Sequence, residues 1–254
     1  MIKEKTKKQH SATVKKVEKV SKTSYYIEIE TPYSFSSSPG QYISILCSNL
    51  TLRRPFSIEY NKDNSIGILF KEKGEGTAYI KSLKIGDSVD FIGPLGNGFN
   101  ILNKKALLVG AGIGIAPIFY LKNRLAELGI ENLTIGAFLN SEEVPENVVC
   151  DEVVTDDGSV GKSGSVLDYL DFYIEKFNPE IIYSCGPEIV LKKIAELSKK
   201  YQIDSQIAME KVMACGIGVC RGCVIQVEKD GMVQNATICK DGPVFRGSEV
   251  VWGK

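Results

Sequence analysis

The sequence lacks several features that define common classes of protein. Its 254 residues include one histidine, His10, and the totals of Lys plus Arg and of Asp plus Glu are both 31. A single histidine excludes a zinc site of two cysteines and two histidines, and it leaves no separate histidine site for acid–base catalysis. The balanced charge gives no basis for binding nucleic acid or an anionic membrane.

No apolar segment has the length of a membrane span. The most apolar run without charged residues, from Ala106 to Leu121, contains three glycines and a proline and falls short of the roughly 20 residues that a spanning helix needs. The first residues show no apolar core of a secretory signal, so we expect a cytoplasmic protein with reduced thiols. We expect the segment up to His10 to be a short solvated tail. Its basic residues are Lys3, Lys5, Lys7 and Lys8.

Cysteine, in contrast, occurs in a diagnostic pattern. Cys215, Cys220 and Cys223 are spaced C-x4-C-x2-C, the plant-type pattern of a [2Fe–2S] cluster, and Cys239 can supply the fourth thiolate. The loop is also rich in glycine, which permits sharp bends and a close approach of the backbone to the cluster. These glycines are Gly216, Gly218 and Gly222.

Structural zinc is the alternative for these cysteines. Zinc sites usually combine two short cysteine knuckles, and only Cys220 and Cys223 form such a knuckle. The spacing therefore favours an iron–sulfur cluster. About 40 residues surround the motif, which is too few for an independent core, so we expect the cluster to contribute to the folding of this part.

The hydrophobic pattern divides the chain into three parts. Residues 1–102 are β-rich, with turn residues between the strands, which predicts an antiparallel β-barrel or sandwich with a short helix near 77–83. The expected strands lie at 25–30, 41–46, 56–60, 65–70 and 88–92.

Residues 103–205 alternate strands with helices, which predicts a parallel α/β domain. The expected strands lie at 106–109, 133–139 and 181–184, and the expected helices at 117–128, 166–177 and 188–201. Residues 206–254 form a small cysteine-containing module. The sequence shows no internal repeat, so the eightfold strand–helix repeat of a TIM barrel is excluded.

Two motifs in the first part could bind phosphate. The run from Arg53 to Ser57 places two arginines on an expected strand, and the planar guanidinium suits a pyrophosphate. An edge strand with solvated arginines explains the same residues equally well. The glycine-rich run from Lys73 to Thr77 opens a helix, where free N–H groups bind phosphate, although turns of this composition are common.

The second part has a glycine-rich loop between a buried strand and a helix, the context of a dinucleotide site. The standard G-x-G-x-x-G pattern does not fit, and the motif that stands is Gly112-x-Gly114-x-x-Pro117. A tight turn without a ligand is the alternative. No Lys or Arg occurs between Arg124 and Lys162, which favours NAD over NADP.

Cys185 lies at the carboxyl end of a later expected strand, where α/β sheets bind ligands. It is followed by Gly186 and Pro187. A nicotinamide contact is the favoured interpretation of this cysteine, and a buried core cysteine is the alternative.

Together these motifs resemble the ferredoxin–NAD(P) reductase superfamily. The sequence resembles the electron-transfer subunits of class 1B, NAD-dependent dihydroorotate dehydrogenases along nearly the whole chain. The resemblance lies in the order of barrel, nucleotide domain and C-terminal cluster module, and in the residues around Cys215 and after Cys239. The resemblance implies a flavin-binding β-barrel, a parallel α/β nucleotide-binding domain and a small C-terminal [2Fe–2S] module.

The resemblance also implies the roles of individual residues. FAD would be held by Arg54, Pro55, Phe56, Ser57, Leu69, Phe70, Lys71, Gly76 and Thr77. NAD would be held by Gly110, Gly112, Gly114, Pro117, Gly186 and Pro187, with Cys185 as the catalytic residue. The cluster ligands would be Cys215, Cys220, Cys223 and Cys239.

The implied partner is an FMN-containing catalytic subunit that oxidises dihydroorotate in pyrimidine biosynthesis, in a heterotetramer with two of each chain. Electrons would pass from FMN to the cluster, then to FAD, then to NAD⁺. One alternative is the FAD/[2Fe–2S] subunit of another reductase, such as an NADH-dependent ferredoxin:NADP oxidoreductase or a sulfhydrogenase. A more distant alternative is a zinc-stabilised nucleotide sensor.

Overall fold

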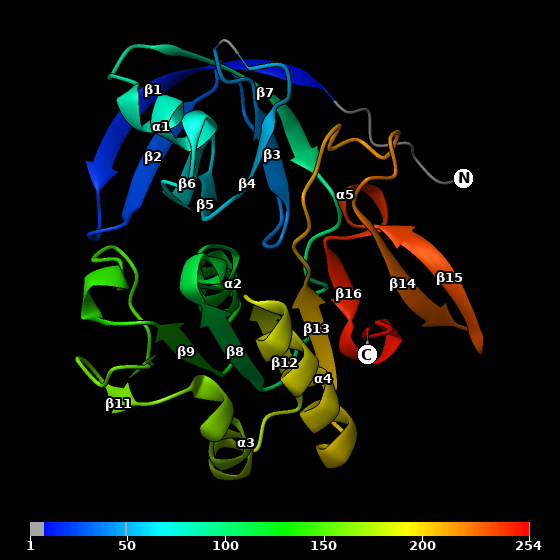
Figure 1. The fold of residues 1–254 in the computed structure, drawn as a ribbon. Coiled ribbons are helices and arrows are strands. Elements are labelled where there is room, and N and C mark those ends of the chain that lie inside the picture. Colours follow the sequence, from blue (N-terminus) through cyan, green and yellow to red (C-terminus); the bar gives the residue numbers. More distant parts are fainter. Residues whose placement is uncertain (1–7, 49, 254) are drawn as a thin grey trace.

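The computed structural model describes residues 8–48 and 50–253, and Figure 1 shows its arrangement. An antiparallel β domain lies at one end, and an α/β domain lies at the other. A smaller unit with an antiparallel hairpin lies beside both of them. The expected basic tail residues Lys3, Lys5 and Lys7 fall outside the described residues.

The first domain is an antiparallel sheet of seven strands in the order β4-β3-β7-β1-β2-β6-β5. Its elements are β1 (Gln9–Lys19), β2 (Ser24–Glu30), β3 (Tyr42–Ile45), β4 (Arg54–Ser57), β5 (Tyr60–Lys62), β6 (Ser65–Lys71), α1 (Glu75–Ser82) and β7 (Ser88–Leu95).

The two edges of this sheet meet, because β4 and β5 are nearly one continuous segment. Only Ile58 and Glu59 separate them. The Ile58 N–H donates to Gln41 O at 3.1 Å on one side, and the Glu59 N–H donates to Gly67 O at 2.9 Å on the other. The sheet therefore closes into the expected barrel, and closure places β4 beside β6.

Strand β1 was not among the expected strands, and it corrects the expected tail. His10 lies in β1, where it pairs with Phe91 of β7 and stacks on that ring with centroids 5.0 Å apart. Its Nε2 is 2.8 Å from Gly93 O. Its few apolar residues, Ala12, Val14 and Val17, lie among polar residues and three lysines, which masked its β character in the sequence.

The second sheet has the order β11-β10-β9-β8-β12-β13-β16 and is parallel except for β16. Its elements are β8 (Ala106–Ala111), η1 (Gly112–Gly114), α2 (Ile115–Glu127), β9 (Asn132–Phe138), η2 (Ser141–Glu143), β10 (Glu152–Thr155), β11 (Lys162–Ser163), η3 (Val166–Asp168), α3 (Leu170–Phe177), β12 (Ile181–Cys185), α4 (Glu188–Tyr201), β13 (Asp204–Ala208) and β16 (Val244–Arg246).

Helices cover both faces of this sheet. Alternate residues of β8 point to opposite faces: Leu108 packs with Ile118 of α2, and Leu107 packs in the core that includes Ile194 of α4. Helix α2 therefore lies between the sheet and the barrel, with α3 and α4 on the far face (Figure 1).

The cysteine-containing unit is inserted between two neighbouring strands of the α/β sheet. It contains β14 (Val224–Lys229), β15 (Met232–Thr237) and α5 (Ile238–Asp241), followed after β16 by η4 (Gly247–Glu249). The chain leaves the sheet after β13 and returns to it as β16, which pairs with β13. The boundary expected between residues 205 and 206 thus falls inside β13. Among the described residues no helix is long and apolar enough to cross a membrane.

The barrel interior gives a test of the fold. Ile68 on β6 is fully buried, whereas Ile85 in the α1–β7 connection is 74% exposed. We expect Ile68→Ala to lower the free energy of unfolding by about 2–5 kcal/mol, because it leaves a cavity in a closed barrel. The matched variant Ile85→Ala should change it by less than about 0.5 kcal/mol. Urea unfolding followed by circular dichroism measures both, and equal effects would contradict the assigned core.

Candidate functional site

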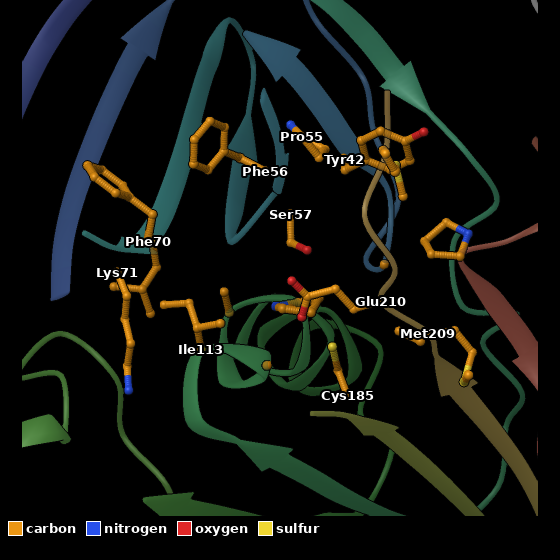
Figure 2. A pocket seen from close by; sticks show the side chains of 18 of the residues that line it. Tyr42, Pro55, Phe56, Ser57, Phe70, Lys71, Ile113, Cys185, Met209 and Glu210 are labelled. Carbon is orange, nitrogen blue, oxygen red and sulfur yellow. The ribbon is translucent and has the colours of Figure 1, made fainter. Parts of the chain in front are cut away.

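A cavity lies where the barrel, the α/β domain and the cysteine-containing unit meet (Figure 2). Its wall combines residues from all three. Of the residues expected to bind cofactor or substrate, those that line it are Pro55, Phe56, Ser57, Leu69, Phe70, Lys71, Thr77, Gly114, Pro117 and Cys185. The structure therefore gathers motifs that are more than 100 residues apart in the sequence.

Barrel closure builds the first wall of the cavity. It brings Phe56 of β4 against Phe70 of β6, with ring centroids 5.8 Å apart in an edge-to-face arrangement. Ser57 points from β4 towards the α/β domain (Figure 2). An apolar wall with a few polar groups suits a flat aromatic ring system. These residues fit the isoalloxazine part of FAD.

Arg54 and Gly76 lie behind this wall and not in it. The Arg54 Nη1 donates to Leu52 O at 2.7 Å, and a Cβ on Gly76 would lie 2.7 Å from Arg54 Cγ. Gly76 therefore allows the arginine side chain to pack against the start of α1. The neighbouring Arg53 is bound to Asp90 at 2.6 Å, whereas Arg54 has no ion pair among the described residues. Arg54 is thus the arginine that could bind a phosphate.

The loop before α1 differs from the expected phosphate cradle. The Thr77 Oγ1 accepts hydrogen bonds from the N–H groups of Lys73 at 2.8 Å and Gly74 at 3.1 Å. These two donors are therefore already used within the loop. Only N–H groups of the first helical turn of α1 could serve a phosphate there.

The second wall comes from the start of α2 and the end of β12. A Cβ on Gly114 would lie 2.7 Å from the Gly186 N, so a glycine is required for β12 to end so close to this turn. Gly112 has φ +55° in the same turn, and Gly110 packs against Ile115; neither lines the cavity. Gly110 and Gly112 therefore shape the turn that places Gly114 and Pro117 at the cavity.

Cys185 faces the cavity across from Ser57 (Figure 2). Burial, assisted by the nearby carboxylate of Glu210, raises the pKa of its thiol to about 12. The thiol is therefore neutral at physiological pH and acts as a small apolar surface with a weak donor. Gly186 and Pro187 line an adjoining cavity at the start of α4.

Four residues are shared by the two cavities, and all except Lys73, which begins the expected glycine-rich run, were missed in the sequence. They are Lys73, Met209, Glu210 and Lys211. Other missed residues of the main cavity are Gly40, Tyr42, Ile113, Ala116, Ala208, Met213 and Pro243. Most of these residues belong to no binding motif. Their position at the cavity depends on β13 and β16, which hold the cysteine-containing unit against the barrel. The run Glu210–Met213, directly before the first cysteine, was the one available signal.

The four expected cluster cysteines are arranged as two pairs. The Cys220 N–H donates to Cys215 Sγ at 3.4 Å, and the Cys239 N–H donates to Cys223 Sγ at 3.4 Å. Within residues 8–48 and 50–253 no three His, Cys, Asp or Glu side chains are placed to share one metal ion. Two thiol pairs fit two irons with two thiolates each, whereas zinc needs four donors around one centre.

The surroundings of the thiols differ between the pairs. Burial disfavours ionisation of Cys215, but N–H donors led by that of Cys220 outweigh it and lower the pKa of the thiol to about 6. Cys239 is buried, and burial together with the neighbouring Cys223 raises the pKa of its thiol to about 12. Cys220 is exposed, as is Val219 beside it, at 76%. The Cys215–Cys220 pair therefore lies on the side of the site that solvent or a partner can reach.

Comparison with known proteins identifies the two cofactor-binding parts. Residues 11–99 match an oxidoreductase FAD-binding domain, and residues 210–251 match the iron–sulfur cluster binding domain of dihydroorotate dehydrogenase B. A structure of an NADH-dependent reduced ferredoxin-NADP oxidoreductase superposes with a TM-score of 0.79 at 27% identity, covering 95% of this chain and 90% of that one. An Amycolatopsis cytochrome P450 reductase, at 17% identity and TM-score 0.63 over 77% of this chain and 67% of that one, shares the fold.

Relatives over nearly the full length carry one name, dihydroorotate dehydrogenase B (NAD(+)), electron transfer subunit. The protein of that name from Caldanaerobacter subterraneus is 38% identical over 84% of this chain and 87% of its own length. The one from Desulforamulus reducens is 31% identical over 96% of this chain and 99% of its own. The one from Listeria monocytogenes is 37% identical, covering 84% and 87%. The chain therefore belongs to the family of electron transfer subunits of dihydroorotate dehydrogenase B.

Proposed function

We propose that this chain passes electrons from the FMN of a dihydroorotate dehydrogenase catalytic subunit to NAD⁺, as an oxidoreductase subunit in pyrimidine biosynthesis. One observation carries the proposal: a single cavity has barrel residues on one wall and Gly114 and Cys185 on the other, and Tyr42 of the barrel wall binds the backbone of the cluster unit at Gly216 and Cys239. Donor and acceptor sites for hydride and for single electrons therefore lie within one compact region.

The residues divide between the groups they would hold. Arg54 would bind the FAD pyrophosphate, and Pro55 to Ser57 and Leu69 to Lys71 would lie along the isoalloxazine ring, with Gly76 and Thr77 at the start of α1. FAD supplies the exchange between a hydride and two single electrons, which a [2Fe–2S] cluster and NAD cannot exchange directly. The four cysteines, Cys215, Cys220, Cys223 and Cys239, would ligate the cluster.

The α/β side would position NAD. Gly114 lets the end of β12 lie against the turn, which places Cys185 at the cavity. The neutral Cys185 thiol would contact the nicotinamide ring while adding no charge. Gly110, Gly112 and Pro117 would shape this loop, and Gly186 and Pro187 would contact the nucleotide in the adjoining cavity. The FAD part is residues 1–102, the NAD part begins at residue 103 and includes all of β13 to Ala208, and the cluster part follows β13.

NAD is the proposed nucleotide in place of NADP. The turn that follows β9 presents Glu142 and Glu143, each of which is already bound to a barrel lysine, Lys22 at 2.7 Å and Lys71 at 2.7 Å. Because these lysines are neutralised, the turn offers no free cation for a 2′-phosphate. The partner would be the FMN-containing catalytic chain in a heterotetramer with two of each subunit, located in the cytoplasm.

A second candidate is the corresponding subunit of another FAD/[2Fe–2S] reductase. The similarity over 95% of the chain to a ferredoxin-NADP oxidoreductase structure supports it. The two candidates share the cavity and the cluster and differ in the partner. The source of the electrons therefore distinguishes them.

The function is tested by mixing the chain, loaded with FAD and cluster, with the FMN-containing dihydroorotate dehydrogenase catalytic subunit from the same source. We expect NADH to form from dihydroorotate and NAD⁺ only when both chains are present, as measured by absorbance. NADH formation by either chain alone would contradict the division of roles. No NADH from the mixture, with NADH oxidation by an artificial acceptor retained, would favour the second candidate.

Two cysteine variants are the matched controls. Cys220→Ser should abolish NADH formation by the mixture, since it removes a ligand, while NADH oxidation with a hydride-accepting dye continues through FAD. Cys150→Ser, which changes a cysteine outside the cluster motif, should behave as the unmodified chain.

The exposed surface beside Cys220 predicts where the partner docks. Val219 is 76% exposed, and an apolar side chain this exposed next to an electron-transfer ligand suits a protein interface. We expect Val219→Asp to weaken binding of the catalytic subunit by at least about tenfold, because the charge must be desolvated on docking. Isothermal titration calorimetry measures the affinity. Ile85→Asp, at a site 74% exposed on the barrel, is the matched control; equal effects would place the interface elsewhere.

A further inference from the structure

Tyr42 is a buried barrel residue whose contacts lie mainly outside the barrel. It begins β3, is 3% exposed, and packs in the core that contains Cys223, Ile238 and Cys239, not in the core of the barrel interior. Its ring lines the main cavity beside Pro55 (Figure 2). One side chain thus belongs to both the cavity wall and the cluster module.

The hydroxyl group of Tyr42 binds the backbone of the cluster site at two points. It lies 2.9 Å from the carbonyl oxygen of Gly216 and 3.1 Å from that of Cys239, so its single proton is shared between two acceptors. Gly216 follows Cys215, and Cys239 is itself an expected ligand. The hydroxyl therefore contacts the backbone at Cys239, from one thiol pair, and at the residue that follows Cys215 of the other pair.

The other side of the ring is fixed by the barrel. Tyr42 is paired with Ser57 of β4 and with Leu95 of β7, so strands on both sides hold its backbone. A Cβ on Gly96 would lie 3.0 Å from its ring, which shows how closely the ring is packed. The tyrosine cannot move without moving the strand that carries Ser57 at the cavity.

We propose that Tyr42 is a positioning residue for electron transfer, which fixes the cluster loop against the cavity wall and makes the cluster easier to reduce. This inference rests on the proposed function, because it requires that the cavity holds FAD and that the four cysteines hold the cluster.

Two physical effects support the proposal. The hydroxyl proton presents the positive end of a dipole to the ligand backbone, which stabilises the extra electron of the reduced cluster. The donor also joins the two parts of the ligand set, Cys215–Cys223 and Cys239, which the β14–β15 hairpin separates in the sequence.

The test is a redox titration of the full chain with FAD and cluster bound, without the partner, in which the reduced cluster is followed by electron paramagnetic resonance. Tyr42→Phe removes only the hydroxyl. We expect a more negative cluster potential, such that the ratio of reduced to oxidised cluster at a fixed applied potential falls about fivefold, the equivalent of one net hydrogen bond. Hydrogen exchange of residues 215–223 should become faster, with the barrel strands unchanged.

Tyr183→Phe is the matched control. Tyr183 is fully buried, and its hydroxyl donates to Asn100 O at 3.0 Å, away from the cysteines. It should leave the cluster potential unchanged. A Tyr42→Phe protein that keeps FAD and cluster at an unchanged potential would overturn the inference, and loss of the cluster with FAD retained would support it.

If the Tyr42→Phe protein loses both FAD and the cluster, a second substitution, fluorotyrosine at position 42, tests the inference. Its hydroxyl is a stronger donor, so the potential should move in the opposite, more positive direction, and no movement would overturn the inference. An unmodified chain that binds neither FAD nor a cluster would overturn the proposed function itself, and the inference with it.

Discussion

The arrangement of the site depends on the antiparallel pairing of β16 with β13. The cluster unit leaves the sheet after one strand and must return beside it, so its two ends are held within one strand spacing. Where the chain leaves and re-enters the sheet, the Met209 N–H donates to Pro243 O at 2.9 Å. The Asn97 N–H, at the end of the barrel, donates to Gly242 O at 2.6 Å. The cluster unit is therefore fixed to both larger domains, which a unit of this size on a flexible linker would not be.

The barrel and the α/β domain meet through polar contacts around the cavity. The Lys71–Glu143 ion pair joins β6 to the turn after β9, with side chains only 18% and 12% exposed. On the other side, Tyr120 of α2 donates to Ser37 O of the barrel at 3.1 Å. Such contacts hold the two walls of the cavity in place relative to each other.

The sequence was sufficient for those features that depend on local spacing. The C-x4-C-x2-C run, the turn at Gly112 to Pro117, the three helices of the α/β part and its strands β8, β9 and β12 follow from chemistry between near neighbours, whereas β10, β11 and β13 were not predicted. The features it did not reveal depend on long-range pairing. Strand β1, of which only Gln9 and His10 fell in the expected tail, was not predicted because only its partners bury its apolar residues. Strand β16 is too short to recognise without β13. Tyr42 and Glu210 carry no motif, and they reach the site only because the cluster unit folds back onto the barrel.

The central claim is that one chain connects a hydride site to a one-electron site through the shared cavity. The most direct measurement adds NADH, under anaerobic conditions, to the purified chain with FAD and cluster bound, and follows both groups by absorbance and electron paramagnetic resonance. The account predicts that NADH bleaches the flavin and produces the signal of the reduced [2Fe–2S] cluster, without any partner chain. A flavin that is reduced by NADH while the cluster stays oxidised, at a potential where the cluster accepts electrons from a chemical reductant, would contradict it.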